Sequence, residues 1–202
     1  MPRPQLHSTD TILDAARDLV LSDGLRGATI EAIAAASGAP TGSIYHRFGS
    51  RDEMIGRAWV RAVKRSQAGF LEALEAEDPR EAAVGAARAL VEFCREHPAD
   101  GQLLLSHSRA ELIGARMSAD LVGSGSSSEL LDELRDLNEP VERAVVELSR
   151  RLYDSAARQS VERVMLVVFD LPYGAVKRHL DTGRPPPADL GDNLERAIRA
   201  VI

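Results

Sequence analysis

The sequence predicts an all-α fold of about nine helices, without an internal repeat. Ala and Leu supply most of a hydrophobic fraction of 44%, whereas only 4% of the residues are aromatic, and this mixture favours helices over strands. Apolar residues recur at spacings of three and four, which is the period of an amphipathic helix. No alternating segment is flanked by a hairpin turn, so no strand is expected.

Start and stop signals define the first two helices. Ser8 or Thr9 can cap a helix over about residues 9–22, and the Ser22-Asp23-Gly24 sequence ends it. Thr29 can cap a second, short helix. Gly38 follows its last turn, at a position that favours a residue in the left-handed backbone conformation.

The next two helices have equally clear boundaries. Pro40 suits the first turn of a third helix, which Phe48 ends before Gly49. The Ser50-Arg51-Asp52-Glu53 sequence is a capping box, with Ser50 bonding forward and Glu53 bonding back. It opens a fourth helix that continues to about residue 75.

The rest of the chain is also helical by its pattern. The Asp78-Pro79-Arg80-Glu81 sequence starts a helix that ends at His97. The Gly/Ser-rich residues 123–128 are expected to form a flexible loop, and Pro172 is expected to kink the helix that contains it. The further helical segments are expected at 102–105, 110–121, 129–137, 141–152, 159–180 and 190–202.

Length, cysteine usage and hydropathy exclude several classes of protein. The 202 residues are enough for one domain and a small additional module. The single cysteine, Cys94, excludes an intrachain disulfide framework. The longest apolar run, 164–169, is much shorter than the roughly 20 residues that span a membrane, and the N-terminus has no apolar signal core. We therefore expect a soluble, cytoplasmic protein without a membrane partner.

Charge is distributed unevenly along the chain. Residues 1–65 carry 9 basic and 7 acidic side chains, whereas the remaining residues carry 16 basic and 24 acidic side chains. Such asymmetry suggests two functions in one chain. Four cations, Arg57, Arg61, Lys64 and Arg65, share one face of the fourth helix, and we interpret that face as solvated, with long-range attraction to DNA as a minor role.

The third helix has an outer face that is unusual for a solvated helix. Ile44 and Phe48 are four residues apart and can face a core. Small hydroxyls, a glycine, a phenol, an imidazole and a guanidinium remain outside, on Thr41, Gly42, Ser43, Tyr45, His46 and Arg47. Such groups can approach and bind phosphates or base edges. Two short helices joined by a glycine-bearing turn are the layout of a helix-turn-helix motif.

Residues 29–48 (TIEAIAAASGAPTGSIYHRF), followed by Ser50-Arg51-Asp52-Glu53-Met54, resemble the DNA-binding signature of the TetR (tetracycline-repressor) family. The resemblance covers about residues 8–65. It implies a helix-turn-helix DNA-binding domain over 1–50 and a helical effector-binding and dimerisation domain over 51–202, linked by the helix at about 51–75. Ala39, Pro40 and Thr41 replace the commoner Val, Ser and Lys of the family.

The resemblance also implies which residues bind double-stranded operator DNA. Thr41, Gly42 and Ser43 would face base edges in the major groove. The phosphate ligands would be Thr29, Tyr45, His46 and Arg51, aided by the partial positive charge of helix N-termini. From the residues alone, Thr29 can equally be only a helix cap, and the ring of Tyr45 can pack half inside.

The second domain carries the expected effector site. Apolar residues on separate helical stripes are the candidate pocket lining: Trp59, Phe70, Phe93, Cys94, Met117, Phe169 and Tyr173. Each of them, taken alone, is equally compatible with plain core. The expected effector is an unidentified small molecule that is mainly apolar or aromatic, because this lining, with Val91 as a further candidate wall residue, is apolar. It is expected to be uncharged or weakly cationic, because the acidic second part would repel an anion.

The resulting hypothesis is a homodimeric repressor that is released from its operator by that small molecule, with no cofactor. By resemblance, the helices at 159–180 and 190–202 pair with their copies through Val164, Leu166, Val167, Leu171, Val176, Leu194, Ile198 and Val201. The alternative for these residues is an intrachain core.

Three other functions compete with this hypothesis. One is a regulator that needs no ligand or responds to oxidation of Cys94. Another is a helical metal-binding enzyme that uses His97, His107 and Glu111, and the last is a purely structural helical protein. No Gly-rich phosphate loop, nucleophile elbow or His-Glu-x-x-His helix occurs in the sequence, so an enzyme is not expected.

Overall fold

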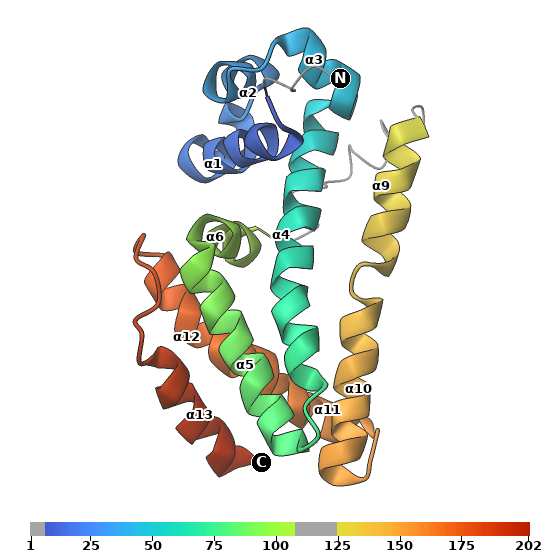
Figure 1. Cartoon of the computed structure of the whole chain (residues 1–202), viewed down its shortest axis with the longest axis vertical. Helices are drawn as coiled ribbons and strands as arrows, with labels where there is room; N and C mark the ends of the chain where they lie inside the picture. The colour runs from blue at the N-terminus through green and yellow to red at the C-terminus, as the bar shows by residue number, and fades with distance from the viewer. Residues whose placement is uncertain (1–6, 108–124) are drawn as a thin grey trace, which may run out of the picture. The chain divides into compact units, whose positions relative to one another are not determined.

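The computed structural model describes residues 7–107 and 125–202, and the predicted all-α class is confirmed (Figure 1). Helices connected by short loops make up these two ranges, and no strand occurs within them. The described residues form two compact units. Of the described residues, the first comprises 7–62, 106–107 and 125–136, and the second comprises 63–105 and 137–202.

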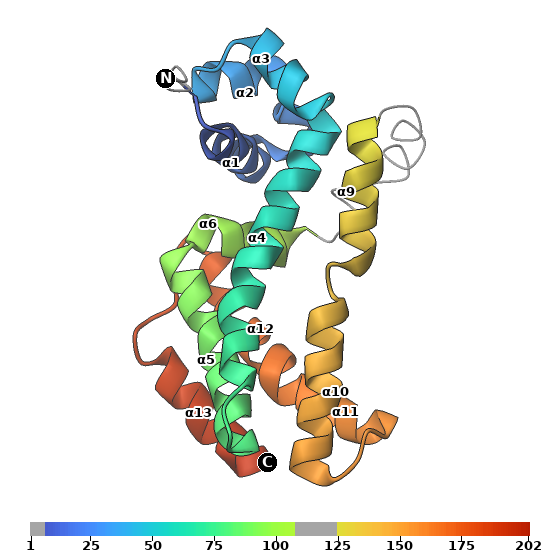
Figure 2. The same cartoon turned by 45° about the vertical axis from the view of Figure 1, so that its right-hand side comes forward.

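The first unit contains α1 (Thr9–Gly27), α2 (Ile30–Ser37), α3 (Thr41–Phe48), the first half of α4 (Arg51–Leu74) and α9 (Gly125–Asp136). In Figure 2 the axes of α1, α2 and α3 run in different directions beside the start of α4. Each helix buries an apolar face, through residues that include Ile12, Ile33, Ile44, Met54 and Leu130, all with no exposed surface. Burial of these faces stabilises short helices that would be marginal alone.

The hydroxyl caps predicted for Ser8, Thr29 and Ser50 are confirmed, and the return bond from Glu53 stays a prediction. The Ser8 hydroxyl accepts a hydrogen bond from the Thr11 amide at 3.0 Å, and the Thr29 hydroxyl accepts one from the Ala32 amide at 3.2 Å. Ser50 accepts from the Glu53 amide at 3.1 Å. These bonds satisfy first-turn amides that have no partner within their own helix.

Glycines mark the turns between these helices. Gly24 breaks α1 with a φ of 70°, so regular helix stops there and one short turn follows. Gly38 also has a φ of 70°, in the left-handed conformation that the sequence predicts after α2. The prediction for Pro40 is wrong by one position, since Pro40 precedes the first turn of α3 in an extended conformation.

The second unit contains the second half of α4 together with the remaining helices. These are α5 (Pro79–Glu96), α6 (Pro98–Ser106), α10 (Glu139–Tyr153), α11 (Arg158–Met165), the π-helical turn η2 (Leu166–Asp170), α12 (Leu171–Leu180) and α13 (Leu190–Val201). Their shared core includes Phe70, Ala87, Leu148, Val167 and Ile198. The helix starting at Asp78 is confirmed, because its carboxylate accepts from the amides of Arg80 and Glu81.

The irregularity predicted at Pro172 takes the form of the π-helical turn η2, which directly precedes it. Proline has no amide hydrogen and its ring crowds the carbonyl four residues earlier, here that of Val168. A π turn lengthens the hydrogen-bonded loop by one residue and removes this conflict.

Two predictions about the 102–128 segment have different outcomes. Residues 125–128 are helical, as the first turn of α9, so the prediction of a flexible loop through Ser128 is wrong for them. These residues are helical despite their loop-like composition because burial of Leu130 and Leu134 in the core stabilises the helix that they begin. The predicted helix 110–121 and the glycine at 123 lie outside the described residues. Over the described ranges, no helix is both long and apolar enough to span a bilayer.

Candidate nucleic-acid interface

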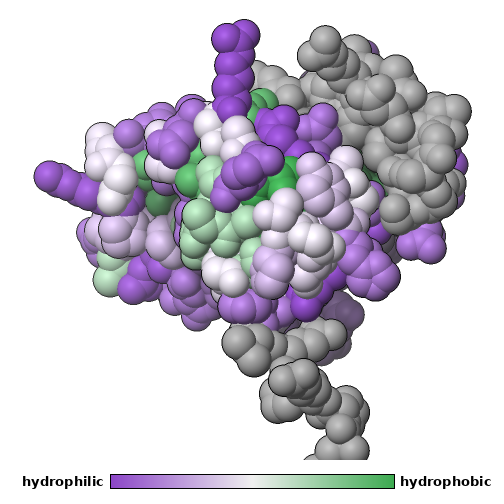
Figure 3. Space-filling view, turned by 90° about the horizontal axis from the view of Figure 1, so that it is seen from above, coloured by the Kyte–Doolittle hydropathy of each residue, from purple (hydrophilic) through white to green (hydrophobic). Residues whose placement is uncertain are grey.

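Helix α3 presents the face that the sequence predicts. Ile44 and Phe48 are buried, whereas Thr41, Gly42, Tyr45 and His46 are exposed. Half of the Tyr45 surface is accessible, which is unusual for so large a side chain. Figure 3, which looks from above the view of Figure 1, shows mostly hydrophilic surface around a smaller apolar area.

The N-terminal end of α3 is open to close approach. Among the described residues, no atom lies within 4 Å of the position that a Cβ on Gly42 would occupy. Gly42 is flanked by the hydroxyls of Thr41, which is exposed, and Ser43, which is half-buried. Thr29 is exposed at the start of α2 and uses its hydroxyl as a cap. Helix N-termini and hydroxyls of this kind suit phosphates and base edges.

Two arginines near this face donate hydrogen bonds to backbone oxygens within the protein. Arg47 donates from Nη1 to the backbone oxygen of His7 at 2.7 Å. Arg51 donates from Nε to the backbone oxygen of Ala28 at 2.7 Å, and its Nη2 donates to the backbone oxygen of Leu25. These bonds hold the start of α1 and the connection between α1 and α2, so both guanidinium groups support the motif from within.

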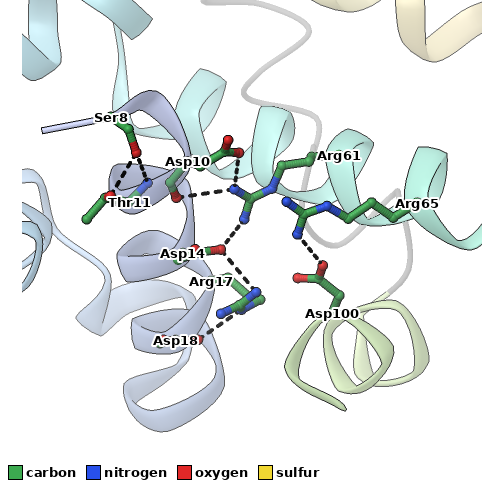
Figure 4. A network of polar contacts seen from close by, with 9 residues as sticks. All are labelled: Ser8, Asp10, Thr11, Asp14, Arg17, Asp18, Arg61, Arg65 and Asp100. Carbon is green, nitrogen blue, oxygen red and sulfur yellow. Dashed lines mark hydrogen bonds and ion pairs between the residues drawn. The ribbon is translucent and has the colours of Figure 1, made fainter. Parts of the chain in front are cut away.

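The interpretation of the cations of α4 as a solvated face is wrong for Arg57 and Arg61, whereas Lys64 and Arg65 are exposed. Arg57 pairs at 2.9 Å with Glu53, whose side chain is fully buried. Arg65 pairs at 3.0 Å with Asp100, which is 1% exposed, within the second unit. Arg61 is 14% exposed and pairs within the first unit with two aspartates of α1 (Figure 4). The carboxylates of α1 and α6 are distant in sequence, so helical spacing along α4 cannot reveal them.

The predicted effector residues are distributed over both units. Trp59 belongs to the first unit and is buried, and its indole N–H has no acceptor among the described residues. In the second unit, the rings of Phe70 and Phe169 stack with centroids 4.7 Å apart. Phe93 is buried there beside His97, with ring centroids 5.7 Å apart.

The other predicted effector residues differ in their surroundings. Tyr173 is 40% exposed and donates to the Leu105 backbone oxygen at 3.3 Å. Met117 lies outside the described residues. Two hollows in the surface of the second unit have volumes of about 520 and 350 Å³. Of the predicted effector residues, Val91 alone is among the described residues that line these hollows, at the smaller one.

Cys94 is deeply buried, and this argues against the redox alternative. Its side chain is 2% exposed, and burial raises the pKa of the thiol from its ordinary value of 9.0 to about 12. The thiolate is the form that oxidants attack, so a neutral, inaccessible thiol reacts slowly. For the metal alternative, Glu111 lies outside the described residues, and no group of three metal-ligating side chains occurs within them.

Comparison with solved structures shows the fold. A regulator named PfmR from Thermus thermophilus is 18% identical, with a TM-score of 0.62 over 94% of this chain and 96% of that chain. A tetR-family transcription regulator from Shewanella sp. PV-4 is 17% identical, with a TM-score of 0.66 over 96% and 94% of the two chains. The fatty acid degradation regulator FadR from Bacillus halodurans is 15% identical, with a TM-score of 0.65 over 96% and 97%.

Residues 12–58 match the sequence model for bacterial regulatory proteins of the tetR family. No curated protein matches the chain significantly. The all-α fold, the helix-turn-helix motif and this match define a DNA-binding transcriptional regulator. Within that class, residues 12–58 of the chain are similar to the tetR family.

Proposed function

We propose that this regulator is a repressor that inserts α3 into the major groove of its operator. Thr41, Gly42 and Ser43 would meet base edges, while Tyr45 and His46 would bind phosphates. The observation that carries this proposal is the outer face of α3, where an open glycine and small hydroxyls precede two exposed ring donors. Base contacts confer sequence preference, whereas phosphate contacts confer position and affinity.

Thr29 and Arg51 would support the same contact in different ways. Thr29 is exposed at the N-terminus of α2, where its hydroxyl and the free amides can approach a phosphate. The guanidinium of Arg51 already binds two backbone carbonyls. We therefore assign Arg51 an indirect role, in which it holds the connection between α1 and α2.

The active species would be a homodimer that uses one face of α11, η2 and α12. Met165, Leu166 and Tyr173 are 37%, 40% and 40% exposed, which is high for apolar and aromatic side chains about two turns apart. The sequence-based choice of interface residues is wrong for several positions. Val164, Val167, Val176, Leu194 and Ile198 are buried in the core of the second unit. A symmetric dimer would place two copies of α3 about 34–36 Å apart on DNA.

A small apolar or aromatic molecule would release the DNA. The support is the buried indole N–H of Trp59, which has no acceptor among the described residues. A buried donor without an acceptor is costly, and a ligand oxygen would remove that cost. A change in Trp59 emission at the ligand concentration that releases DNA would support this effector model. Release of DNA without any such change would count against it.

The experiment that tests DNA binding starts from fragments selected out of random DNA by the purified protein. We expect Tyr45→Phe and His46→Ala to weaken binding to selected and random fragments alike. Ser43→Ala and Thr41→Ala should instead change which fragments are selected, with a loss of about 1–3 kcal/mol on the original site. Unchanged binding by the Tyr45 and His46 variants at every salt concentration would mean that α3 is oriented differently.

A further inference from the structure

The N-terminal end of α1 is held by an arginine of α4. Arg61 donates from Nη1 to Asp10 twice, at 2.7 Å to Oδ1 and at 3.2 Å to the backbone oxygen. Its Nη2 donates to Oδ1 of Asp14. Figure 4 shows the guanidinium of Arg61 lying between these two aspartates, which stand one turn apart on α1.

The surroundings of Arg61 fix its geometry. Its side chain is 14% exposed, and Asp14 also accepts from Arg17, which is equally buried, at 3.2 Å. Charge-assisted hydrogen bonds in a partly buried setting are stronger than exposed ion pairs. Arg61 therefore ties the first two turns of α1 to the part of α4 that belongs to the same unit.

A second arginine ties the same end of α1 to α3. Arg47 donates to the backbone oxygen of His7, which is followed by Ser8, the N-cap of α1. The His7 ring lies next to Gly38, where an added Cβ would stand 3.3 Å from Cε1 of the histidine. The start of α1 is thus held from α4 by Arg61 and from α3 by Arg47.

We propose that Arg61 is a positioning residue for DNA binding, which acts on α3 through Asp10 and Asp14, the start of α1, and the His7–Arg47 hydrogen bond. The proposal rests on the proposed function, in which α3 contacts DNA. In this proposal Arg61 does not bind DNA directly, because its Nη1 and Nη2 donate to the carboxylates and carbonyl of α1 and its Nε is buried. Changes at Arg61 alter the position of α3 through a chain of contacts that lies within the first unit.

The test compares Arg61→Gln, Arg47→Gln and the double variant, each binding a DNA fragment selected by the wild-type protein and a random fragment of equal length. Each single variant is expected to bind the selected fragment about tenfold more weakly, within the usual range for coupled contacts. The double variant is expected to bind no more weakly than either single variant, because both changes interrupt one path.

Salt dependence and a control variant separate positioning from direct contact. The slope of log affinity against log salt concentration is expected to stay unchanged in Arg61→Gln, as is affinity for random DNA, because no phosphate ligand is lost. The matched control is Arg135→Gln, in the same unit, where Arg135 makes an exposed pair with Asp132 at 3.0 Å. It is expected to bind both fragments like the wild type.

Three results would overturn the proposal. Losses that add in the double variant would show that Arg61 and Arg47 act independently. If the slope of log affinity against log salt concentration falls by about 1 in Arg61→Gln, Arg61 is a phosphate ligand. If Arg61→Gln binds the selected fragment with wild-type affinity, Arg61 has no role in DNA binding. If Arg61→Gln does not fold, Asp14→Asn interrupts the same contact at a carboxylate that is 43% exposed, and the same results apply. Failure of the proposed function is distinct, since the wild-type protein would then select no DNA.

Discussion

At the scale of single residues, Gly42 combines poor helix propensity with an open position at the start of α3. Replacement by alanine is expected to raise the free energy of unfolding by about 0.5–1 kcal/mol, because glycine is costly in a helix. The space around the new methyl group is empty among the described residues, so no clash offsets this gain.

The same Gly42→Ala variant is expected to bind its selected DNA more weakly, because the methyl group would stand between the backbone and the base edges. Thermal unfolding and gel-shift titration on one protein preparation measure the two effects. A variant that gains stability and keeps full affinity would show that Gly42 is not at the DNA surface.

Burial of Cys94 has a measurable pH consequence. Its pKa is about 12 in the folded protein and about 9 when the thiol is exposed. Between these values the unfolded state holds fewer protons than the folded state, so the free energy of unfolding falls as the pH rises. We expect the free energy of unfolding of Cys94→Ala, measured by denaturant titration, to fall less than that of the wild type between about pH 8 and pH 11. An identical pH dependence in the variant would show that Cys94 is exposed or already ionised.

At the scale of elements, Gly101 sets how closely α6 approaches its neighbours in the second unit. A Cβ on Gly101 would lie 2.9 Å from Sγ of Cys94 and 3.1 Å from Cδ1 of Leu180. Both distances are shorter than a normal contact between these atoms. The absence of a side chain at this position lets α6 pack directly on α5 and α12.

Gly101→Ala is therefore expected to lower the free energy of unfolding by about 1–3 kcal/mol through overpacking. The loss should shrink when Cys94→Ala removes the sulfur atom from the same contact. Gly69→Ala is the matched control in α4, because its new methyl group would meet only Ala89, at an ordinary 3.7 Å. Denaturant unfolding measures all of these proteins, and an unperturbed Gly101→Ala would mean that α6 packs more loosely.

Most elements could be predicted because their signals are local. Ser8, Thr29, Ser50 and Asp78 each cap the helix that the sequence assigns to them. The exception, residues 125–128, has the composition of a loop and the structure of a helical turn. Its conformation depends on burial of Leu130 and Leu134 in the first unit, and local composition does not encode that burial.

At the scale of the whole molecule, the proposed dimer depends on a short apolar face. Leu166→Glu would place a charge in the proposed interface, where its desolvation is unfavourable. We expect light scattering to report the 21.9 kDa monomer for this variant and DNA affinity to fall with it. Leu166→Met, which keeps volume and apolar character, should remain a dimer. A dimeric Leu166→Glu would place the interface on another face.

The candidate site could be predicted only in part, because some of its contacts depend on how helices distant in sequence pack together. The exposed residues of α3 follow from helical spacing, so Tyr45 and His46 lie where the sequence places them. Arg47 bonds to His7, which is 40 residues away in the sequence. Arg51 bonds to Ala28 over 23 residues, and Arg61 bonds to Asp10 over 51 residues. Contacts at such separations arise from the packing of helices, and no spacing rule along one helix identifies them.

The π turn at Leu166–Asp170 also determines how sequences related to this one should be aligned. It holds one residue more than an α-helical turn, and each residue of an α-helix advances by about 100°. Deleting one residue there would convert the wide turn into an ordinary α-helical turn, so the residues beyond it, Tyr173 included, would keep their directions. A homologue that lacks this residue would therefore present the same set of side chains on α12, and its alignment with this chain should place the one-residue gap within Leu166–Asp170.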